Sequence, residues 1–377
     1  MGFSDRKVLL ITASVGSGHN QAARSISEGL AEAGCDSMTI DVMSYVPAWF
    51  RWYYSGGYSL AVSRLPFLYG VGFRLNDMPD LPHRNISEKI RIAFESAAAS
   101  RLVRAVFDYK PDIIVNTHFL APPILARLGY DNQFIVVTDI QAHRWWYSEG
   151  IDRWFVQQPQ SANRLIEKWN VPQGKITVSG MPVRMAFDTS RSDGDDLRRE
   201  LRLPAGRPVV LLSGGTVFTC GPVPAIARGI ASICPNACVV VLAGRNKKLL
   251  ARLGSMAESR DGRVVPMGFT DRVSDLMDAA SLMVTKSGGM ICAECIAKSL
   301  PAVFMPPVPG QEAQNAKYLA ECGAARVAEK FSDIGGIVAE MLADGDGLAN
   351  MQKAAGGLKR PARKIIVEKI IERISNH

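Results

Sequence analysis

The chain has 377 residues, of which 47% are hydrophobic and 21% charged, and its formal net charge is +8. This length suits two domains of ordinary size, and the composition is that of a soluble globular protein. The best apolar run, between Tyr58 and Phe73, is interrupted by Arg64 and Pro66, which excludes a bilayer-spanning segment there. The positive charge favours an anionic partner, and by itself it leaves open a phosphate ligand, a nucleic acid or an acidic membrane surface.

Seven cysteines are scattered over both halves of the chain. An odd, dispersed set fits reduced thiols in the cytosol better than a disulfide framework. Cys292 and Cys295 form a Cys-x-x-Cys pair that Cys234 and Cys238 could complete as a metal site, but both pairs lie among core-type residues without a nearby histidine. We therefore expect no metal.

Strands, small-residue loops and amphipathic helices alternate from the N-terminus. The apolar run 8–13 follows Asp5 and predicts a first strand, not a signal peptide. Residues 16–18 predict a loop, and the spacing of apolar residues from Ala22 to Leu30 predicts a helix that stops at Gly34. Further strands are predicted at 38–42, 112–116, 134–138, 154–156 and 176–178. This alternation predicts an α/β fold with a parallel sheet covered by helices on both faces.

Residues 180–194 are polar and lack periodicity, so they predict an interdomain linker. The pattern then restarts with a strand at 209–212, a glycine loop at 213–216 and a helix from about Pro222, and it continues through Val327. Two doubly wound, Rossmann-like domains would face a cleft and bind ligands at the carboxyl ends of their strands. The expected domains are 1–185, which would bind the acceptor and the membrane, and 186–360, which would bind the donor.

The last segment, 361–377, predicts a helix with one isoleucine-rich side. Such a face could touch a membrane. We expect the commoner arrangement, in which the helix packs back on the N-terminal domain and its isoleucines serve as core.

The most informative stretch runs from Lys286 to Asn315. An apolar strand at 282–285 leads into Ser287, Gly288 and Gly289 and then into a helix, which predicts a phosphate cradle of backbone N–H groups at a helix N-terminus. Glu294, one turn further, could reach ribose hydroxyls. After the next strand, Gln311 and Glu312 offer an amide and a carboxylate to a second polyol. Phosphate, ribose and sugar sites in this order indicate a nucleotide-sugar.

Two absent motifs narrow the enzyme class. The chain contains no Gly-x-x-x-x-Gly-Lys-Ser/Thr, which argues against hydrolysis of a nucleoside triphosphate. Gln21 stands where the dinucleotide fingerprint begun by Gly16 and Gly18 needs a third small residue, which argues against a dehydrogenase.

His19 follows the first glycine loop at the start of a helix, where the cleft is expected. Glycosyl transfer needs a base for the acceptor hydroxyl, and the pKa of histidine suits that task near neutral pH. The alternative is a histidine that only caps or packs beside the loop. Asp139 also follows a predicted strand and could orient His19 or act as the base itself, whereas His118 and His143 are more typical of structural polar residues.

Five short segments together resemble one known family, the monogalactosyldiacylglycerol synthases and processive diacylglycerol glucosyltransferases, which are related to the N-acetylglucosaminyltransferase MurG. The matching segments cover both halves in order: Gly16-Ser17-Gly18-His19-Asn20-Gln21-Ala22-Ala23, Val137-Thr138-Asp139, Gly180-Met181-Pro182-Val183-Arg184, Gly268-Phe269 and Pro309-Gly310-Gln311-Glu312.

The resemblance implies a GT-B fold, inverting transfer from a UDP-sugar without metal or bound cofactor, no nucleic-acid partner, and peripheral attachment to the inner face of the cell membrane in the cytoplasm. Matched positions imply His19 as the base or an acceptor-loop residue. They also imply a set of donor contacts: Arg184 for the diphosphate, Phe269 and Thr270 for the uracil, Gly289 and Met290 for the phosphates, Glu294 for the ribose, and Gln311 with Glu312 for the sugar. The loop of Ser213, Gly214 and Gly215 joins this expected donor site, although 213–217 has fewer glycines than is usual in the family and Ile291 replaces an expected hydroxyl.

The segment from Val46 to Phe73 is rich in aromatic residues interleaved with Arg51 and Arg64. This mixture suits the headgroup boundary of an anionic membrane, and the alternative is an insertion whose aromatic residues pack on the first domain. The segment therefore favours a lipid acceptor.

The expected function is transfer of a hexose from UDP-glucose or UDP-galactose to diacylglycerol or a related lipid. The alternatives are a UDP-N-acetylglucosamine transferase acting on a polyprenyl lipid, a nucleotide-sugar epimerase of the same fold, and a non-catalytic basic protein that binds a membrane.

Overall fold

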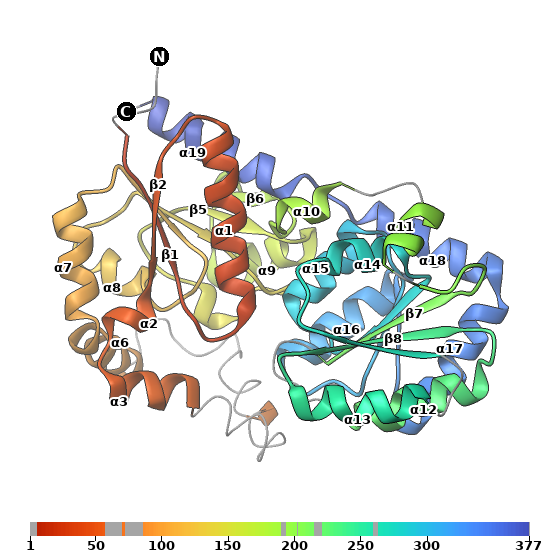
Figure 1. Cartoon of the computed structure of the whole chain (residues 1–377). Coiled ribbons are helices and arrows are strands. Elements are labelled where there is room, and N and C mark those ends of the chain that lie inside the picture. The colour runs from red at the N-terminus through yellow and green to blue at the C-terminus, as the bar shows by residue number, and fades with distance from the viewer. Residues whose placement is uncertain are drawn as a thin grey trace. The chain divides into compact units, whose positions relative to one another are not determined.

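The computed structural model describes residues 6–56, 70–71, 86–189, 194–201, 203–214, 221–258 and 263–376. The chain divides into two compact units. One comprises Met1–Met185, Pro309–Gln311 and Arg360–His377, and the other Ala186–Val308 and Glu312–Lys359. Each unit contains one parallel six-stranded sheet (Figure 1), so the predicted doubly wound α/β class is confirmed.

The sheet of the N-terminal unit has the strand order β2-β1-β3-β4-β5-β6. Its strands are β1 (Val8–Thr12), β2 (Ser37–Asp41), β3 (Ile113–Asn116), β4 (Gln133–Val136), β5 (Ile151–Val156) and β6 (Ile176–Val178). The helices around it are α1 (Ser17–Glu32), α2 (Val42–Tyr45), α3 (Ala48–Arg51), a π-helical turn (Trp52–Gly56), α6 (Ile86–Ala98), α7 (Ser100–Tyr109), α8 (Pro122–Ala126), α9 (Pro159–Trp169) and α19 (Ala362–Ser375). All of α10 (Met185–Asp188) except Met185 belongs to the other unit.

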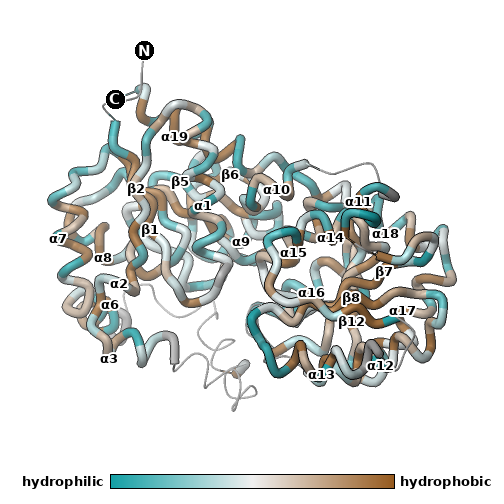
Figure 2. The backbone as a smooth tube through the Cα atoms, viewed as in Figure 1, coloured by the Kyte–Doolittle hydropathy of each residue, from teal (hydrophilic) through white to brown (hydrophobic). Residues whose placement is uncertain are grey.

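Both faces of this sheet are buried, because β1 is apolar at every position but Thr12 and successive side chains point to opposite faces. Leu9 and Ile11 pack with residues of α2, α7 and α8. Val8 and Leu10 pack with α1 and with the isoleucines of α19 (Figure 1). Figure 2 shows the hydrophobic colour concentrated in the strands.

The C-terminal unit repeats this plan with the order β12-β11-β10-β7-β8-β9. Its strands are β7 (Val209–Ser213), β8 (Cys238–Gly244), β9 (Val264–Gly268), β10 (Leu282–Thr285), β11 (Ala302–Phe304) and β12 (Ala325–Val327). Its helices are α11 (Gly194–Glu200), α12 (Val223–Ile233), α13 (Lys247–Glu258), α14 (Val273–Ala279), α15 (Gly289–Ala297), α16 (Gln311–Glu321), α17 (Ile334–Ala343) and α18 (Gly345–Gly357).

The chain passes from one unit to the other within the predicted linker 180–194, between Met185 and Ala186. The stretch is less irregular than expected, because α10 lies within it and the side chain of Phe187 is buried. The backbone carbonyl of Val183 accepts a hydrogen bond from the buried Ser25 hydroxyl at 2.5 Å, which ties the start of the stretch to α1. The first glycine loop is also shorter than expected, since α1 begins at Ser17 directly after Gly16, whose φ of 140° favours glycine.

None of the described helices combines the length and apolarity that crossing a membrane requires. The aromatic segment is described only as far as Gly56 and at residues 70–71. Tyr58, Arg64, Phe67, Tyr69 and Phe73, on which part of the membrane prediction rests, lie outside the described residues.

Candidate active site

His19 sits in the first turn of α1, and its ring is fixed by residues that follow two other strands. Its Nδ1 lies 2.8 Å from the backbone oxygen of Thr117, just after β3, and 3.0 Å from the hydroxyl of Thr138, after β4. A carbonyl oxygen can only accept, so Nδ1 carries the proton and the neutral ring keeps its lone pair on Nε2. The imidazole is thus held in the tautomer that a base needs.

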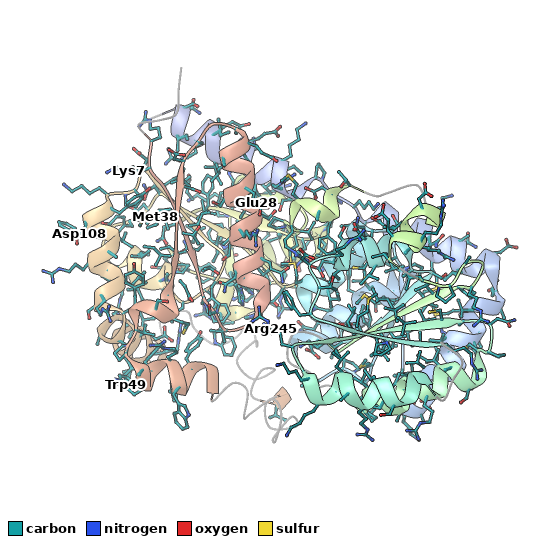
Figure 3. All side chains as sticks on the ribbon, in the orientation of Figure 1. Lys7, Glu28, Met38, Trp49, Asp108 and Arg245 are labelled. Atoms are coloured by element: carbon teal, nitrogen blue, oxygen red, sulfur yellow. The ribbon has the colours of Figure 1, made fainter. Side chains whose placement is uncertain are left out.

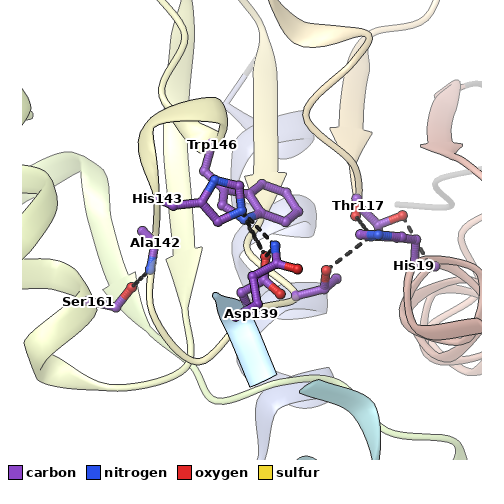
Figure 4. A network of polar contacts seen from close by, with 9 residues as sticks. His19, Thr117, Asp139, Ala142, His143, Trp146 and Ser161 are labelled. Carbon is purple, nitrogen blue, oxygen red and sulfur yellow. Dashed lines mark hydrogen bonds and ion pairs between the residues drawn. The ribbon is translucent and has the colours of Figure 1, made fainter. Parts of the chain in front are cut away.

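The Thr117 side chain completes this support, because its hydroxyl donates to the backbone oxygen of His19 at 3.1 Å. Strands β1, β3 and β4 are neighbours in the parallel sheet, so their carboxyl ends meet at one edge. Figure 4 shows His19 beside Thr117 at this edge. Neither threonine was among the predicted site residues.

Burial lowers the pKa of His19 below its ordinary value of 6.5, although the negative charge of Asp139 and the hydrogen bond to Thr117 act in the opposite direction. His19 is therefore neutral at pH 7 and able to accept a proton. The predicted identity of the base is compatible with this geometry and stays a prediction.

Asp139 lies near His19, but its carboxylate is bound by other side chains. The indole nitrogen of Trp146 donates to it at 2.7 Å, and Nε2 of His143 lies 3.2 Å away (Figure 4). Burial tends to raise the pKa of Asp139, but the hydrogen bond and charge of His143 and the hydrogen bond from Trp146 together bring it below its ordinary value. Asp139 is therefore an ionised carboxylate that acts on His19 through its charge, while Thr117 and Thr138 orient the ring.

His118 and His143 have different surroundings from His19. His118 accepts a hydrogen bond from the backbone of Leu120 at 3.1 Å and stacks on Phe119, and burial lowers its pKa well below 6.5. It packs edge-on against His19 with ring centres 4.6 Å apart. Its role is structural, whereas His143 is the partner of Asp139.

A cavity of about 540 Å³ opens beside His19. Most of its wall is aromatic, and Asp139 also lines it. Its size falls in the range of small-molecule binding sites. A largely apolar cavity next to a neutral, correctly protonated imidazole can deliver a hydroxyl on an apolar molecule to a base.

The predicted donor residues of the C-terminal unit gather at the carboxyl ends of β7, β10 and β11. The register aligns Ser213, Thr285 and Phe304 at this edge. Gly288 caps α15, whose first-turn N–H groups have no side-chain cap. Gly289 and Met290 begin the helix, so free backbone donors lie where the sequence predicts phosphate.

Ser287 connects this loop to α16. Its hydroxyl donates to the backbone oxygen of Glu312 at 2.7 Å, and Asn315 donates to the backbone oxygen of Ser287 at 2.9 Å. Lys286 pairs with the Glu312 carboxylate at 3.1 Å. This lysine was not among the predicted site residues, and its ion pair helps to position Glu312, a predicted sugar contact.

Gln311, the first residue of α16, joins the surroundings of Asp139. Its side-chain Nε2 donates to the Asp139 carboxylate at 3.0 Å and lies 2.9 Å from Nε2 of His143, and Gln311 lines the cavity beside His19. Glu294 is buried on α15 with 6% of its surface exposed. Phe269 and Thr270 follow β9, and the Arg245 guanidinium lies 4.7 Å from the exposed Phe269 ring. Two members of the predicted donor set remain. Gly214 directly follows β7, and Gly215 lies outside the described residues.

Arg184 belongs to the N-terminal unit, where it follows β6 and is half-buried. Within the described ranges, no group of three or more His, Cys, Asp or Glu side chains is arranged to hold a metal ion. Cys234, Cys238, Cys292 and Cys295 are buried free thiols, and burial raises the pKa of each.

Two family models match the chain. Residues 19–183 match the monogalactosyldiacylglycerol synthase model, and residues 231–366 match the glycosyltransferase family 28 C-terminal domain. A processive diacylglycerol beta-glucosyltransferase of Bacillus subtilis strain 168 is 27% identical, over 98% of this chain and 96% of that protein. The corresponding protein of Bacillus cytotoxicus is also 27% identical, over 98% of this chain and 94% of its own length.

Solved structures share the fold. MurG of Acinetobacter baumannii superposes with a TM-score of 0.62 at 16% identity and covers 97% of this chain and 99% of its own. MnaA of S. aureus, solved with UDP, has a TM-score of 0.62 at 15% identity, and the match covers 98% of this chain and 97% of MnaA. The predicted resemblance is confirmed: the two halves of the chain match, in order, a monogalactosyldiacylglycerol synthase model and a glycosyltransferase family 28 C-terminal domain, nearly the whole chain is similar to processive diacylglycerol beta-glucosyltransferases, and the fold is that of the GT-B glycosyltransferases.

Proposed function

We propose that this protein transfers a hexose from a UDP-sugar to a hydroxyl group of diacylglycerol or a closely related lipid, with inversion at the anomeric carbon. The observation that carries the proposal is the His19 imidazole, which is half-buried, neutral and fixed by the hydrogen bond that its Nδ1 donates to the backbone oxygen of Thr117, and which lines an aromatic cavity. The names of the relatives, diacylglycerol glucosyltransferases, agree with an apolar acceptor.

In the proposed reaction, Nε2 of His19 takes the proton of the acceptor hydroxyl as its oxygen attacks the anomeric carbon of the sugar. The bond between that carbon and the diphosphate oxygen breaks, and UDP leaves with the electron pair. The imidazolium formed is stabilised by the nearby Asp139 carboxylate, whose own charge is held by His143 and Trp146. The proton then passes from His19 to solvent, which restores the base.

The donor contacts stay as the sequence predicts them. Backbone N–H groups at Ser287, Gly288, Gly289 and Met290 would bind the phosphates at the positive end of α15. Glu294 would accept hydrogen bonds from the ribose, and Gln311 with Glu312 would bind the sugar. Phe269 and Thr270 would bind the uracil, and Arg184 would also contact the diphosphate. The loop of Ser213, Gly214 and Gly215 would lie beside the donor.

The direct test of the function uses UDP-glucose and UDP-galactose labelled in the sugar, with and without diacylglycerol vesicles. We expect label in the lipid fraction only when both substrates are present. Label in a polyprenyl lipid from UDP-N-acetylglucosamine would favour the alternative acceptor, and conversion of the sugar without a lipid would favour an epimerase. No turnover of any donor would leave only a binding protein.

Glu294→Ala should weaken UDP-sugar binding by about 1.5–3 kcal/mol, because charge-assisted hydrogen bonds to the ribose would be lost. Calorimetry with UDP measures this directly. Glu321→Ala, which removes an exposed glutamate of α16 in the same unit, is the control and should bind UDP normally. Unchanged UDP affinity in a folded Glu294→Ala protein would reject the ribose assignment, and so would equal losses for UDP and for simple sulfate.

We also propose that the aromatic segment docks the protein on the cytoplasmic face of an anionic membrane. Trp49, Trp52 and Tyr53 expose 54%, 76% and 62% of their surfaces, and Arg51 is exposed between them. Figure 3 shows Trp49 on α3 at the periphery of the N-terminal unit. Exposed indole rings beside a cation suit the headgroup region.

Replacing Trp49, Arg51 and Trp52 together by alanine should reduce binding to anionic vesicles and leave turnover of a short-chain, dispersed acceptor nearly intact, since these side chains would dock lipid and do no chemistry. Vesicle sedimentation at low and high salt measures the effect, and wild-type binding should weaken as salt rises. The control is Arg104→Ala with Phe107→Ala, which removes an exposed cation and ring from α7. Vesicle binding by the triple variant at the wild-type level would contradict the docking proposal.

A further inference from the structure

The cavity beside His19 is bounded by a continuous series of aromatic rings that leads to the protein surface. The ring of His118 lies 4.6 Å from that of His19 and 6.0 Å from that of Tyr54. Tyr54 stacks on Phe50 at 5.7 Å, and the exposed Tyr53 also lines the cavity. A hydrocarbon chain could therefore remain in apolar contact from the surface to the base.

One ion pair interrupts this apolar wall. Arg91 and Glu95 lie on successive turns of α6, and the Nη1 of Arg91 donates to both carboxylate oxygens of Glu95 at 2.9 and 2.8 Å. Both residues line the cavity, and Glu95 is only 6% exposed. Burial and the charge of Glu95 raise the pKa of the neighbouring Tyr54 far above its ordinary value, so this hydroxyl stays protonated beside the carboxylate.

The cavity carries more negative than positive charge among the described residues that line it. Glu95 and Asp139 are carboxylates, whereas Arg91 is the guanidinium that neutralises one of them. The two lining histidines, His19 and His118, are neutral because burial lowers the pKa of each. A phosphorylated headgroup in this space would face a net repulsion, while an uncharged polyol would not.

We propose that Glu95, held by Arg91, is the specificity-determining carboxylate of the acceptor site. It accepts a hydrogen bond from a hydroxyl of an uncharged polyol headgroup while the acyl chains follow the aromatic wall. The pair thereby selects neutral hydroxylated lipids over lipids with an anionic headgroup. This inference rests on the proposed transfer to a lipid. It adds that the acceptor headgroup is uncharged and that Glu95 is the residue that recognises it.

The test compares two dispersed short-chain acceptors, dioctanoylglycerol and dioctanoylphosphatidylglycerol, under saturating UDP-sugar. Glu95→Gln keeps the side-chain shape and removes the charge. We expect about a tenfold rise in KM for dioctanoylglycerol, the size of one lost hydrogen bond to a charged group, with the UDP-sugar KM unchanged. The preference for the neutral over the anionic acceptor should fall by at least as much, because the substitution removes one negative charge from the cavity wall.

Two further variants separate selection from damage to the fold. Arg91→Met should move the acceptor preference in the opposite direction, toward stronger rejection of the anionic acceptor. A general loss of structure would not make the two variants change the ratio of neutral to anionic acceptor use in opposite directions. Glu28→Gln is the matched control, since Arg24 and Glu28 form the same i,i+4 pair at 2.8 Å on the exposed face of α1. It should leave both acceptors unaffected.

Binding is measured separately from turnover by quenching of tryptophan fluorescence with a spin-labelled dioctanoylglycerol, since Trp145 lines the cavity. Wild-type transfer with an unchanged acceptor preference in Glu95→Gln would overturn the assignment of Glu95 and leave the transfer proposal standing. Quenching that depends on Glu95, in a protein that transfers no sugar to lipid, would support the acceptor site and overturn the transfer proposal. Absence of both quenching and transfer would overturn both.

Discussion

His19→Ala is expected to lower kcat by about 10²–10⁴-fold, the usual loss when a general base is removed, while the dissociation constant for the UDP-sugar changes little. The reason is the arrangement at Nδ1: because Nδ1 donates its N–H to the Thr117 carbonyl, the lone pair lies on Nε2, which would take the acceptor proton in the proposed reaction. Alanine removes that atom and leaves the C-terminal donor residues untouched. Single-turnover kinetics and calorimetry measure the two quantities separately.

The pH profile adds a second readout. Burial places the pKa of His19 below 6.5, so kcat/KM should be constant near pH 7 and fall only at lower pH, as the imidazole takes up a proton. The His19→Ala variant should lack this acid limb, and added imidazole should restore part of its rate. If His19 only caps the loop, the loss will appear in stability or donor affinity. A folded variant with kcat within a few-fold of wild type would transfer the assignment to Asp139.

Asp139→Asn is expected to lower kcat by a smaller factor, on the order of 10- to 100-fold. The carboxylate raises the pKa of His19 through its charge, so its removal should make the imidazole a weaker base and move the acid limb of kcat/KM to still lower pH. The Asn side chain keeps one hydrogen-bond acceptor for Trp146 or His143. The pH profile and kcat are the measurements.

The double variant decides between the two roles of Asp139. If the carboxylate supports His19, Asp139→Asn should add little to the loss already caused by His19→Ala. If Asp139 were the base, its variant would show the larger defect of the two. Asp152→Asn serves as the control, because it removes a carboxylate of the same unit that pairs with Arg373.

The fold was accessible from the sequence because each central strand is apolar along its length and is followed by a small-residue loop and an amphipathic helix. The strand 282–285 and the buried face of α1 from Ala22 to Leu30 are examples. Polar composition identified the stretch 180–194, in which the chain passes between the two units, but it did not reveal that Phe187 is buried there. Local pattern therefore specified the elements, and tertiary packing specified the exceptions.

The surroundings of His19 could be predicted only in part. The sequence identifies the histidine. Thr117 and Thr138 contact it because β1, β3 and β4 are neighbours in the sheet, and this strand order cannot be predicted from local sequence patterns. The partners of Asp139 had a weak signal, since His143 and Trp146 follow within the same loop. Arg91 and Glu95 look like an ordinary surface pair until the fold places them in the cavity wall.

The helix α19 has a consequence for the order in which the protein is made. Its residues Ile366, Ile370 and Ile374 share a buried cluster with Val8 and Leu10 of the first strand. Ribosomes release a chain from its N-terminus, so the strands of the N-terminal unit emerge before the C-terminal unit does. The face of their sheet that α1 and α19 cover together is only partly covered until α19 has been translated. The intervening C-terminal unit can fold in the meantime. The half of the molecule that contains His19 therefore keeps apolar surface exposed until α19 has been made, although its strands are synthesised before those of the C-terminal unit.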